Sequence, residues 1–484
     1  MAASGLQTID HVIVLMLENR SFDMMLGFLY DDRGNVSLSG QPFDGLTGSE
    51  YNLDASGKKV GVFKIDAKKK YAYYMPGADP GEHFQDANVQ LFGKDPPPAG
   101  GAATSGGFAT NFKAALAYDK KEKRKILSGT VASNIMGMFP REMLPVLSGL
   151  ARGYAVCDHW FSSVPTQTMP NRAFVCAGTS QGHMDDATHS FTVPSIFGLL
   201  SQHGVSWAIH GYDTPPLTRG DFPDTLSAPD ANFGLFTDFQ AAAARGTLPA
   251  YTFLEPEWSP TGNSQHPNYN VALGEQLIHD VYYALRHGPA WERTLLIITY
   301  DEHGGCYDHV PPPSGAVPPD ATPGEFGFDF RRFGVRVPAV LVSPLIAPGT
   351  VFRSPGATPI DHTSILKTVA ERWLPPGTSL TKRDAAAPSL AGVLSLATAR
   401  TDDPLDGVTV PKAPGPSPFS LASPPSHLQQ VHAASVARLP VASATGGFPH
   451  GPPPLRTSGQ AKDYIRKRTA AWKARRRRGP AATA

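Results

Sequence analysis

The hydrophobic positions along the chain fall into two patterns that together predict an α/β fold. Short unbroken apolar runs, typical of strands buried on both faces of a parallel sheet, occur at residues 12–17, 205–209, 294–300 and 338–342. Apolar residues at helical spacing occupy residues 195–203, 271–285 and 362–373, the last with Asp361 as its expected N-cap. This alternation indicates a mostly parallel central sheet flanked by helices.

The other segments suggest how the chain is divided. Residues 30–115 are rich in Gly and Lys and are interpreted as a long insertion after the first strand, and residues 310–335 as a loop. From about residue 400 onward Pro, Ser and Ala dominate. We therefore expect a main domain over residues 1–400 and a Pro/Ser-rich extension over residues 401–484, which forms an extended strap or a flexible tail.

Composition excludes several classes of protein. The chain has 484 residues, of which 41% are hydrophobic, enough for a substantial core. No apolar run approaches the roughly 18 residues of a membrane span. Three cysteines, Cys157, Cys176 and Cys306, cannot form a disulfide framework, and none has zinc-site spacing.

The net charge of +1 gives no overall attraction to nucleic acid, and we expect no nucleic-acid partner. Positive charge gathers in YIRKRTAAWKARRRRGP at residues 464–480, so residues 1–460 are net acidic. We interpret the basic segment as a solvated, partly disordered tail. The alternative is a transient contact of this tail, with Trp472, at an anionic membrane surface.

The N-terminal sequence gives a prediction of location. No Lys or Arg precedes the apolar run at residues 12–17, so the chain shows no secretory signal. We expect a cytoplasmic protein unless a leader was removed or another export route is used.

Two predicted strands end in clustered oxygen ligands. Glu18 and Asn19 follow the first strand, and Asp301 and Glu302 follow the strand at residues 294–300, with His303 next. Ligands of open α/β sheets bind beyond the carboxyl ends of strands. Because gathered carboxylates repel one another, a divalent metal ion is the simplest explanation. The alternative is that the first pair caps a helix at Ser21 and the second makes ordinary salt bridges.

The segment SSVPTQTMPNRAF at residues 162–174 offers a candidate nucleophile. Pro170 suits the first turn of a helix, with Thr168 just before it. A hydroxyl held there beside a metal ion could attack phosphorus, and Arg172 could brace phosphate oxygens. The alternative is that Thr168 is a plain N-cap.

Four of the 16 histidines have suggestive settings. His83 lies in DPGEHF, His210 follows a predicted strand, His266 lies in NSQHPNYN and His303 follows the acidic pair. Imidazole can donate to phosphate oxygens or protonate a leaving oxygen. Spacing along the chain does not distinguish these roles from those of ordinary surface histidines, which are the alternative.

With these residues named, the chain resembles the bacterial phosphoesterase family of phospholipases C and an acid phosphatase, within the alkaline phosphatase superfamily. The resemblance is carried by ENRSFD after the first strand, by TMPNR at residues 168–172 and by TYDEHGGCYDHVPPP at residues 299–313. It covers about residues 10–375 and implies an alkaline-phosphatase-like fold.

The resemblance also implies roles for single residues. Glu18, Asn19, Asp301 and Glu302 would hold a metal ion of unknown identity, and Thr168 would be both nucleophile and ligand. His83 and His266 would contact phosphate or act as the acid, with His210 a weaker match. Arg172 and His303 would bind substrate. The chain departs from many relatives in having Thr166 and Gln167 where they have Gly-Pro.

The implied activity is metal-dependent hydrolysis of phosphate esters through a phosphothreonine intermediate. A phospholipase C acting on phosphatidylcholine-type phosphodiesters is the first hypothesis, and an acid phosphatase acting on monoesters is the alternative. A sulfatase-like or phosphopentomutase-like relative is a further alternative, but no cysteine lies in a C/S-x-P-x-R motif. The last alternative is a non-catalytic binder that acts through the basic tail.

Overall fold

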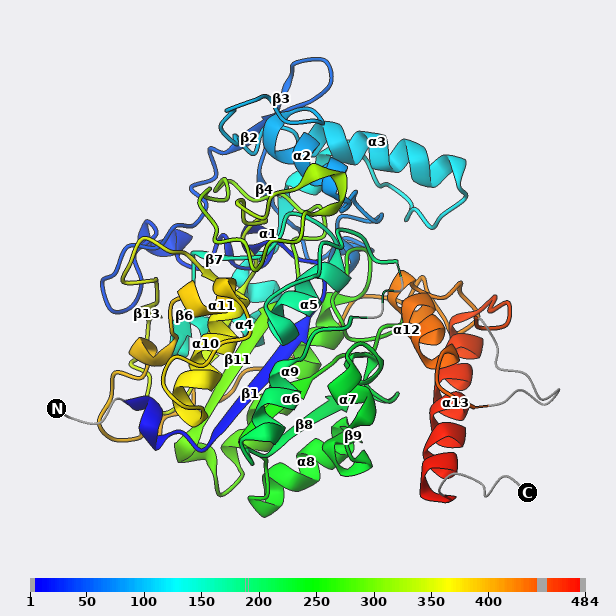
Figure 1. Cartoon of the computed structure of the whole chain (residues 1–484). Helices are drawn as coiled ribbons and strands as arrows, with labels where there is room; N and C mark the ends of the chain where they lie inside the picture. Colours follow the sequence, from blue (N-terminus) through cyan, green and yellow to red (C-terminus); the bar gives the residue numbers. More distant parts are fainter. Residues whose placement is uncertain (1–4, 188, 190, 442–450, 479–484) are drawn as a thin grey trace.

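A central eight-stranded sheet forms the core of the protein. The computed structural model describes residues 5–187, 189, 191–441 and 451–478 (Figure 1). The strands lie in the order β13-β6-β12-β11-β1-β10-β8-β9. Their bounds are β1 His11–Leu17, β6 Ala155–Val156, β8 Trp207–Gly211, β9 Phe233–Leu235, β10 Tyr251–Leu254, β11 Thr294–Tyr300, β12 Ala339–Val342 and β13 Thr350–Val351. All pairings are parallel except those of β12, so the prediction of a mostly parallel sheet is confirmed.

The four predicted strands are present, but one runs in the opposite direction. The runs at residues 12–17 and 294–300 are the neighbouring strands β1 and β11, and the run at 205–209 corresponds to β8. The run at residues 338–342 is β12, which is antiparallel to both β11 and β6. The expectation that it joins the parallel set is therefore wrong. An apolar run indicates burial on both faces, and burial does not depend on strand direction.

Helices cover both faces of the sheet (Figure 1). One layer contains α5, α6 and α10, and the other contains α4, α8 and α9. Their bounds are α4 Pro145–Gly153, α5 Thr168–Ala177, α6 Ile196–Gln202, α8 Phe236–Arg245, α9 Val271–Arg286 and α10 Thr363–Trp373, with α7 Pro223–Ser227 and α11 Lys382–Ala386 at the periphery. The three predicted helices are α6, α9 and α10.

The N-cap of α10 is His362, so the prediction of Asp361 at that position is wrong by one residue. Asp361 lies in the short strand β14 (Ile360–Asp361), which pairs with β7 (Trp160–Phe161). Its carboxylate still accepts a hydrogen bond from the backbone N–H of Thr363 at 3.1 Å. The acidic side chain therefore serves the helix N-terminus from one residue further back.

The segment between β1 and α4 forms a cap at the top of the molecule in Figure 1. It contains α1 Phe22–Leu26, α2 Phe84–Phe92 and α3 Phe108–Lys121, and the short strands β2 Tyr51–Leu53, β3 Lys59–Gly61, β4 Phe63–Lys64 and β5 Gly137–Met138. This segment includes the predicted insertion at residues 30–115. It brings residues 79–83, which precede α2, over the carboxyl end of β1.

The C-terminal extension packs against the main body. Helices α12 (His427–Ala437) and α13 (Ser458–Arg478) contact each other, at the right in Figure 1. Ile465 and Trp472 of α13 are buried, with 1% and 4% of their surface exposed. The expectation of a solvated tail is therefore wrong for residues 464–478, and residues 479–484 lie outside the described part. No helix of the described residues is long and apolar enough to cross a membrane.

Candidate active site

The pairing of β1 with β11 brings the two acidic motifs together. Leu17 and Tyr300 are partners in the parallel register, so the residues that follow them leave the sheet side by side. The backbone N–H groups of Asn19 and Glu302 both donate to Oδ1 of Asp301, each at 2.8 Å. Ser21 supplies its own side chain as the cap of α1, so the alternative in which Glu18 and Asn19 cap that helix is wrong.

Thr168 meets this cluster from the start of α5. The helix begins at Thr168 with Gln167 as its N-cap, so the alternative of Thr168 as a plain cap is wrong. The Thr168 hydroxyl donates to Oδ1 of Asn19 at 2.9 Å. Arg172 lies one turn later on the same face and donates from Nε to Oδ2 of Asp301 at 3.0 Å. The hydroxyl and the guanidinium therefore face the two strand ends together.

Asn171 fixes the loop that leads into α5. Its side-chain amide donates to the carbonyls of Val164, Thr166 and Gln167 at 2.9–3.1 Å, and its oxygen accepts from the N–H of Val164. These bonds satisfy buried backbone groups that the irregular loop would otherwise leave unpaired. This explains why Pro170, Asn171 and Arg172 occur as one motif, in which Asn171 holds the loop and Arg172 holds the acidic cluster.

Buried carboxylates outnumber cations in the cluster. Glu82, which the sequence did not single out, accepts from Nδ2 of Asn19 at 2.5 Å. The pKa of Glu18 is raised to about 7, mainly by burial, with His266 opposing the rise and Asp301 adding to it. Burial, Glu82 and Asp301 also raise the pKa of Glu302. Oε2 of Glu18 and Oε1 of Glu302 are buried without any hydrogen-bond partner, so these oxygens are open to a cation.

A second acidic cluster in the protein shows the contrast. Asp23, Asp308 and His309 also lie within reach of one ion, but Arg336 donates to both of these carboxylates at 2.8–2.9 Å. That cluster carries its own cation. Among the described residues, the arginine that bonds to a carboxylate of the Asn19 cluster is Arg172, and its Nη1 has no hydrogen-bond partner.

The residues at the Asn19 cluster fit a divalent metal ion. They offer carboxylate, amide and hydroxyl oxygens, which hard cations prefer. The side chains that converge here are Glu18, Asn19, Thr168, Asp301 and Glu302, all with 2% or less of their surface exposed. The group of described residues beside this cluster whose ligand atoms all lie within 4.8 Å of one another is Asp79, Glu82 and His266. Glu18, Asp301 and Glu302 are not such a group in this structure.

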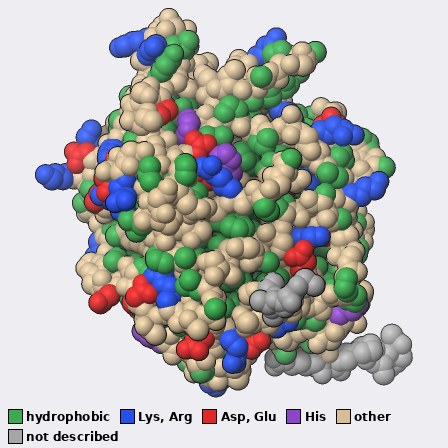
Figure 2. Space-filling view, turned by 90° about the vertical axis from the view of Figure 1, so that its left-hand side faces the viewer, with side chains coloured by type: hydrophobic (Ala, Val, Ile, Leu, Met, Phe, Trp, Pro, Cys, Tyr) green, Lys and Arg blue, Asp and Glu red, His purple; other side chains and the backbone are tan. Residues whose placement is uncertain are grey.

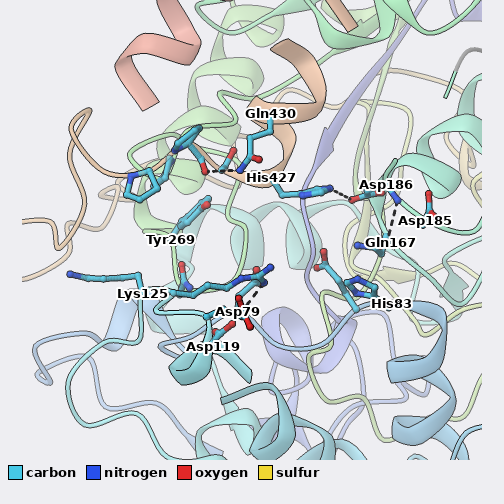
Figure 3. Close-up of a pocket in the computed structure, with 18 of the residues that line it drawn as sticks. Asp79, His83, Asp119, Lys125, Gln167, Asp185, Asp186, Tyr269, His427 and Gln430 are labelled. Atoms are coloured by element: carbon cyan, nitrogen blue, oxygen red, sulfur yellow. Dashed lines mark hydrogen bonds and ion pairs between the residues drawn. The ribbon is translucent and has the colours of Figure 1, made fainter. Parts of the chain in front are cut away.

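A cavity of about 940 Å³ opens beside the cluster (Figure 3). Thr168 is not part of the lining, but three lining residues connect the cavity to it. Glu82 accepts from Asn19, Gln167 directly precedes Thr168, and Asp186 accepts from the N–H of Met169. The outer lining is mixed, with Asp79, Asp119, Lys125, Tyr269, Phe419 and His427. Burial, with help from Asp79, raises the pKa of Asp119 to about 6.

A protein-family model, the Phosphoesterase family, matches residues 9–374 of the chain. The chain belongs to the Phosphoesterase family. It is therefore a phosphoric ester hydrolase, and the alternative of a non-catalytic binder is wrong. The matched range includes every residue of the cluster and ends before the C-terminal extension.

Relatives of this phosphoesterase occur in plants and bacteria. Non-specific phospholipase C1 of Arabidopsis thaliana is 36% identical over 396 residues, which cover 78% of this chain and 69% of the relative. Phospholipase C A of Mycobacterium tuberculosis is 29% identical, over 81% of this chain and 78% of the relative. Among solved structures, the PsFucS1 sulfatase from Pseudoalteromonas sp. has 13% identity and a TM-score of 0.33 over 53% of this chain and 68% of its own. The family assignment rests on the sequence relatives.

Two of the four candidate histidines of this phosphoesterase lie near the cluster. His266 is buried, with Nδ1 3.0 Å from the carbonyl of Pro267 and Nε2 3.8 Å from Asp79. Burial alone would lower the pKa of His266, but Asp79 and Glu18 raise it above the usual value. His83 is the N-cap of α2 and lines the cavity with its side chain 64% exposed.

Neither of the other two histidines lies in the cavity lining, and His266 is also absent from it, so His83 is the one candidate histidine of the four that lines the cavity. His210 lies within β8, one residue before its end, so the expectation that it follows the strand is wrong, and its Nδ1 is 3.2 Å from the carbonyl of Leu235 in β9. His303 is fully buried and pairs through Nε2 with Oε1 of Gln90 at 2.7 Å. Burial lowers the pKa of His303 to about 3, so the ring is neutral. In this position His303 links the acidic loop to α2.

Several supporting residues escaped the sequence analysis. Arg20 donates to the carbonyls of Gln265 and His266 and so holds the loop of His266 against β1. His362 pairs with the carbonyl of Asp301 at 2.6 Å. Asp186 accepts from the backbone N–H of Met169 at 2.6 Å, next to Thr168. The motif ENRSFD was a signal for Arg20, whereas Asp186 lies in a loop that no pattern connects to the site.

Proposed function

We propose that this phosphoesterase is a metal-dependent enzyme that transfers the phosphoryl group to Thr168 and then to water. The observation that carries the proposal is the placement of the Thr168 hydroxyl. It lies at a helix start and donates to Asn19, inside a buried set of oxygen ligands with two unpartnered carboxylate oxygens. A structural threonine would not need this excess of buried negative charge around it.

The chain's own residues would prepare the attack. Thr168 Oγ1 bonds to phosphorus, the ester oxygen leaves, and water later displaces Thr168 from the phosphothreonine. Arg172 holds Asp301 and the carbonyls of Met16 and Leu17, and so keeps α5 fixed against the strand end. A divalent cation held by Glu18, Asn19, Thr168, Asp301 and Glu302 would supply the positive charge that favours the Thr168 alkoxide and offsets the phosphate oxygens.

His266 is the candidate that protonates the leaving oxygen. Its Nδ1 lies 3.0 Å from the carbonyl of Pro267, which places a proton on Nδ1. When the ring is doubly protonated, Nε2 carries the proton that can be given away, and it faces Asp79 at the cavity. His83 is the second candidate, since it lines the same cavity.

The proposed substrate is a phospholipid phosphodiester. The relatives named phospholipase C support this choice. The cavity also supports it, because a diester needs room for a second substituent on phosphorus, and a volume of about 940 Å³ provides that room. Hydrolysis of simple phosphomonoesters remains the alternative.

The test replaces Thr168 by Ala and by Ser in the full chain. Thr168→Ala removes the nucleophile, so turnover of p-nitrophenylphosphorylcholine should fall by about three orders of magnitude or more, while circular dichroism stays unchanged. Thr168→Ser keeps the hydroxyl and should keep measurable activity.

Near-normal turnover by Thr168→Ala would contradict the mechanism. The wild type should also be assayed with p-nitrophenyl phosphate. If it cleaves only this monoester, the phospholipase assignment fails and the phosphatase alternative holds.

A further inference from the structure

The C-terminal extension supplies one wall of the active-site cavity. Seven residues of the lining come from beyond the range that the family model matches. They are Phe419, Ser423, Pro424, Pro425, Ser426, His427 and Gln430. Figure 3 shows His427 and Gln430 on α12, across the cavity from His83. The wall opposite α2 is therefore built by the end of the chain.

His427 contacts a residue that is bonded to the catalytic helix. Its Nε2 lies 3.6 Å from Oδ2 of Asp186, and the other oxygen of Asp186 accepts from the N–H of Met169 at 2.6 Å. Asp186 itself is 3% exposed, whereas the His427 side chain is 53% exposed and borders the cavity. One buried carboxylate thus joins the first residue of α12, a contact drawn in Figure 3, to the first turn of α5, next to Thr168.

Packing joins the same two helices. Leu428 and Val431 of α12 form a buried apolar cluster with Met169, Leu217 and Trp258. The Met169 side chain, adjacent to Thr168, is therefore covered by α12. Such close-packed contacts transmit a displacement of one element to the next.

A third connection runs through Trp258. Ser426, the N-cap of α12, donates its hydroxyl to the carbonyl of Trp258. The guanidinium of Arg172 lies over the Trp258 ring, 4.5 Å from its centre. Because Arg172 also holds Asp301, α12 supports both the nucleophile's helix and the acidic cluster.

We propose that His427 is a positioning residue, which through Asp186 sets the N-terminus of α5 and the orientation of Thr168. The C-terminal extension is then a working part of the active site. This inference rests on the proposed role of Thr168. The Asp186 carboxylate lies between the imidazole of His427 and the backbone N–H of Met169. Loss of the imidazole would leave the carboxylate with fewer restraints. The start of α5 would then be more mobile.

The test is a double-mutant cycle in the full-length protein, assayed with p-nitrophenylphosphorylcholine. His427→Ala should lower kcat by about ten- to a hundredfold with a smaller change in KM, because misplacement of the nucleophile slows the chemical step. Asp186→Asn alone should also lower kcat. In the Asp186→Asn background, His427→Ala should add little, because the path from His427 to Thr168 is already broken.

His427→Lys and His427→Gln separate charge from hydrogen bonding. Lys keeps a cation opposite Asp186 and should restore part of kcat if the ion pair is what matters, whereas Gln restores it if a neutral donor is sufficient. His203→Ala is the matched control, because His203 is exposed at the end of α6 and should leave kcat unchanged in either background.

Hydrogen exchange gives a readout that does not depend on activity. A peptide spanning residues 165–175 should exchange faster in His427→Ala than in the wild type, and no faster in His203→Ala. Independent, multiplicative effects of the two substitutions on kcat would overturn the proposal. So would wild-type kcat and exchange in His427→Ala. An inactive wild type, or an active Thr168→Ala, would instead mean that the proposed function fails.

Discussion

At the scale of single residues, the site is organised around Asn19. Its backbone has φ 58, in the left-handed region that asparagine tolerates better than most residues. This conformation lets its N–H reach Asp301, its side-chain oxygen receive Thr168 and its amide reach Glu82. One residue therefore contacts three of the elements that meet at the cavity.

Gly304 allows the backbone of Asn19 to approach closely, and its replacement should destabilise the fold. A Cβ at Gly304 would lie 2.2 Å from the carbonyl oxygen of Asn19, and Gly304 has φ +60. Gly304→Ala should therefore lower the unfolding free energy by about 3 kcal/mol, from backbone strain plus overlap. Gly34 has φ +62 with nothing near its Cβ position. Gly34→Ala should cost only about 1 kcal/mol.

Chemical denaturation measures both variants, and metal titration should show weaker binding only for Gly304→Ala. Equal losses of stability would mean that the close approach to Asn19 has no energetic effect.

At the scale of elements, a buried carboxylate joins two helices far from the cavity. Glu275 of α9 accepts from the N–H groups of Val146 and Leu147, at 2.7 and 3.1 Å, in the first turn of α4. These bonds satisfy donors that a helix start leaves free. The net pKa of Glu275 is nevertheless raised to about 8, because the effect of burial exceeds the opposing effect of the two N–H groups.

This raised pKa predicts a pH dependence of stability. The folded value of about 8 lies above the usual pKa of 4.5, so the contribution of Glu275 is fully present below about pH 4.5 and is lost as the pH rises from there through 8. Relative to Glu275→Gln, the wild type should lose at most about 1.4 kcal/mol of unfolding free energy per pH unit between about pH 5 and 8. Unfolding in urea across this range measures the difference. Exposed Glu292 provides the control, as Glu292→Gln. A pH-independent difference between wild type and Glu275→Gln would contradict the prediction.

The length and residue pattern of each helix or strand decide whether the sequence predicts it. β1 and β11 are long, central and apolar on both faces, so their runs were evident. β6 and β13 have two residues each, too few for any periodic signal. The sequence does not predict α13, because its large buried apolar residues, Ile465 and Trp472, lie in a segment dominated by Lys and Arg, without a continuous apolar face.

The same reasoning applies to the site. Glu18, Asn19, Asp301 and Glu302 were found because they follow predicted strands, and the parallel register then fixed their proximity. Asp186 and His427 reach Thr168 from a loop and from a distant helix. Their placement depends on tertiary packing, which no local pattern encodes.

At the scale of the whole molecule, acidic and basic side chains are interspersed, and several of them form ion pairs. On the face seen in Figure 2, acidic and basic side chains are interspersed. On α13, Lys462 contacts Asp213 and Glu257, and Arg466 contacts Asp213. Arg466 belongs to the basic segment that suggested a membrane contact, and here it binds α13 to the main body of the protein.

Metal removal should affect the whole molecule. Without a cation, Glu18, Glu82, Asp301 and Glu302 remain buried together, so a chelator should abolish turnover and lower the Tm. An ion present at 100 times its Kd would contribute about 2.7 kcal/mol to the unfolding free energy. Glu302→Gln removes one of these ionisable groups. In chelator this variant should melt above the wild type, and with metal below it. A Tm that does not respond to chelator in the wild type would contradict the metal site.

The position of α12 in the chain has a consequence for biosynthesis. Every strand of the central sheet precedes residue 352, and Thr168 is made before half of the chain has been translated. A nascent polypeptide can therefore assemble its sheet while residues 427–437 are still within or near the ribosome. Until that helix docks, the apolar surface around Met169 and Trp258 stays uncovered. A product of premature termination after residue 400 would keep the sheet and the acidic cluster but lack the wall that carries His427.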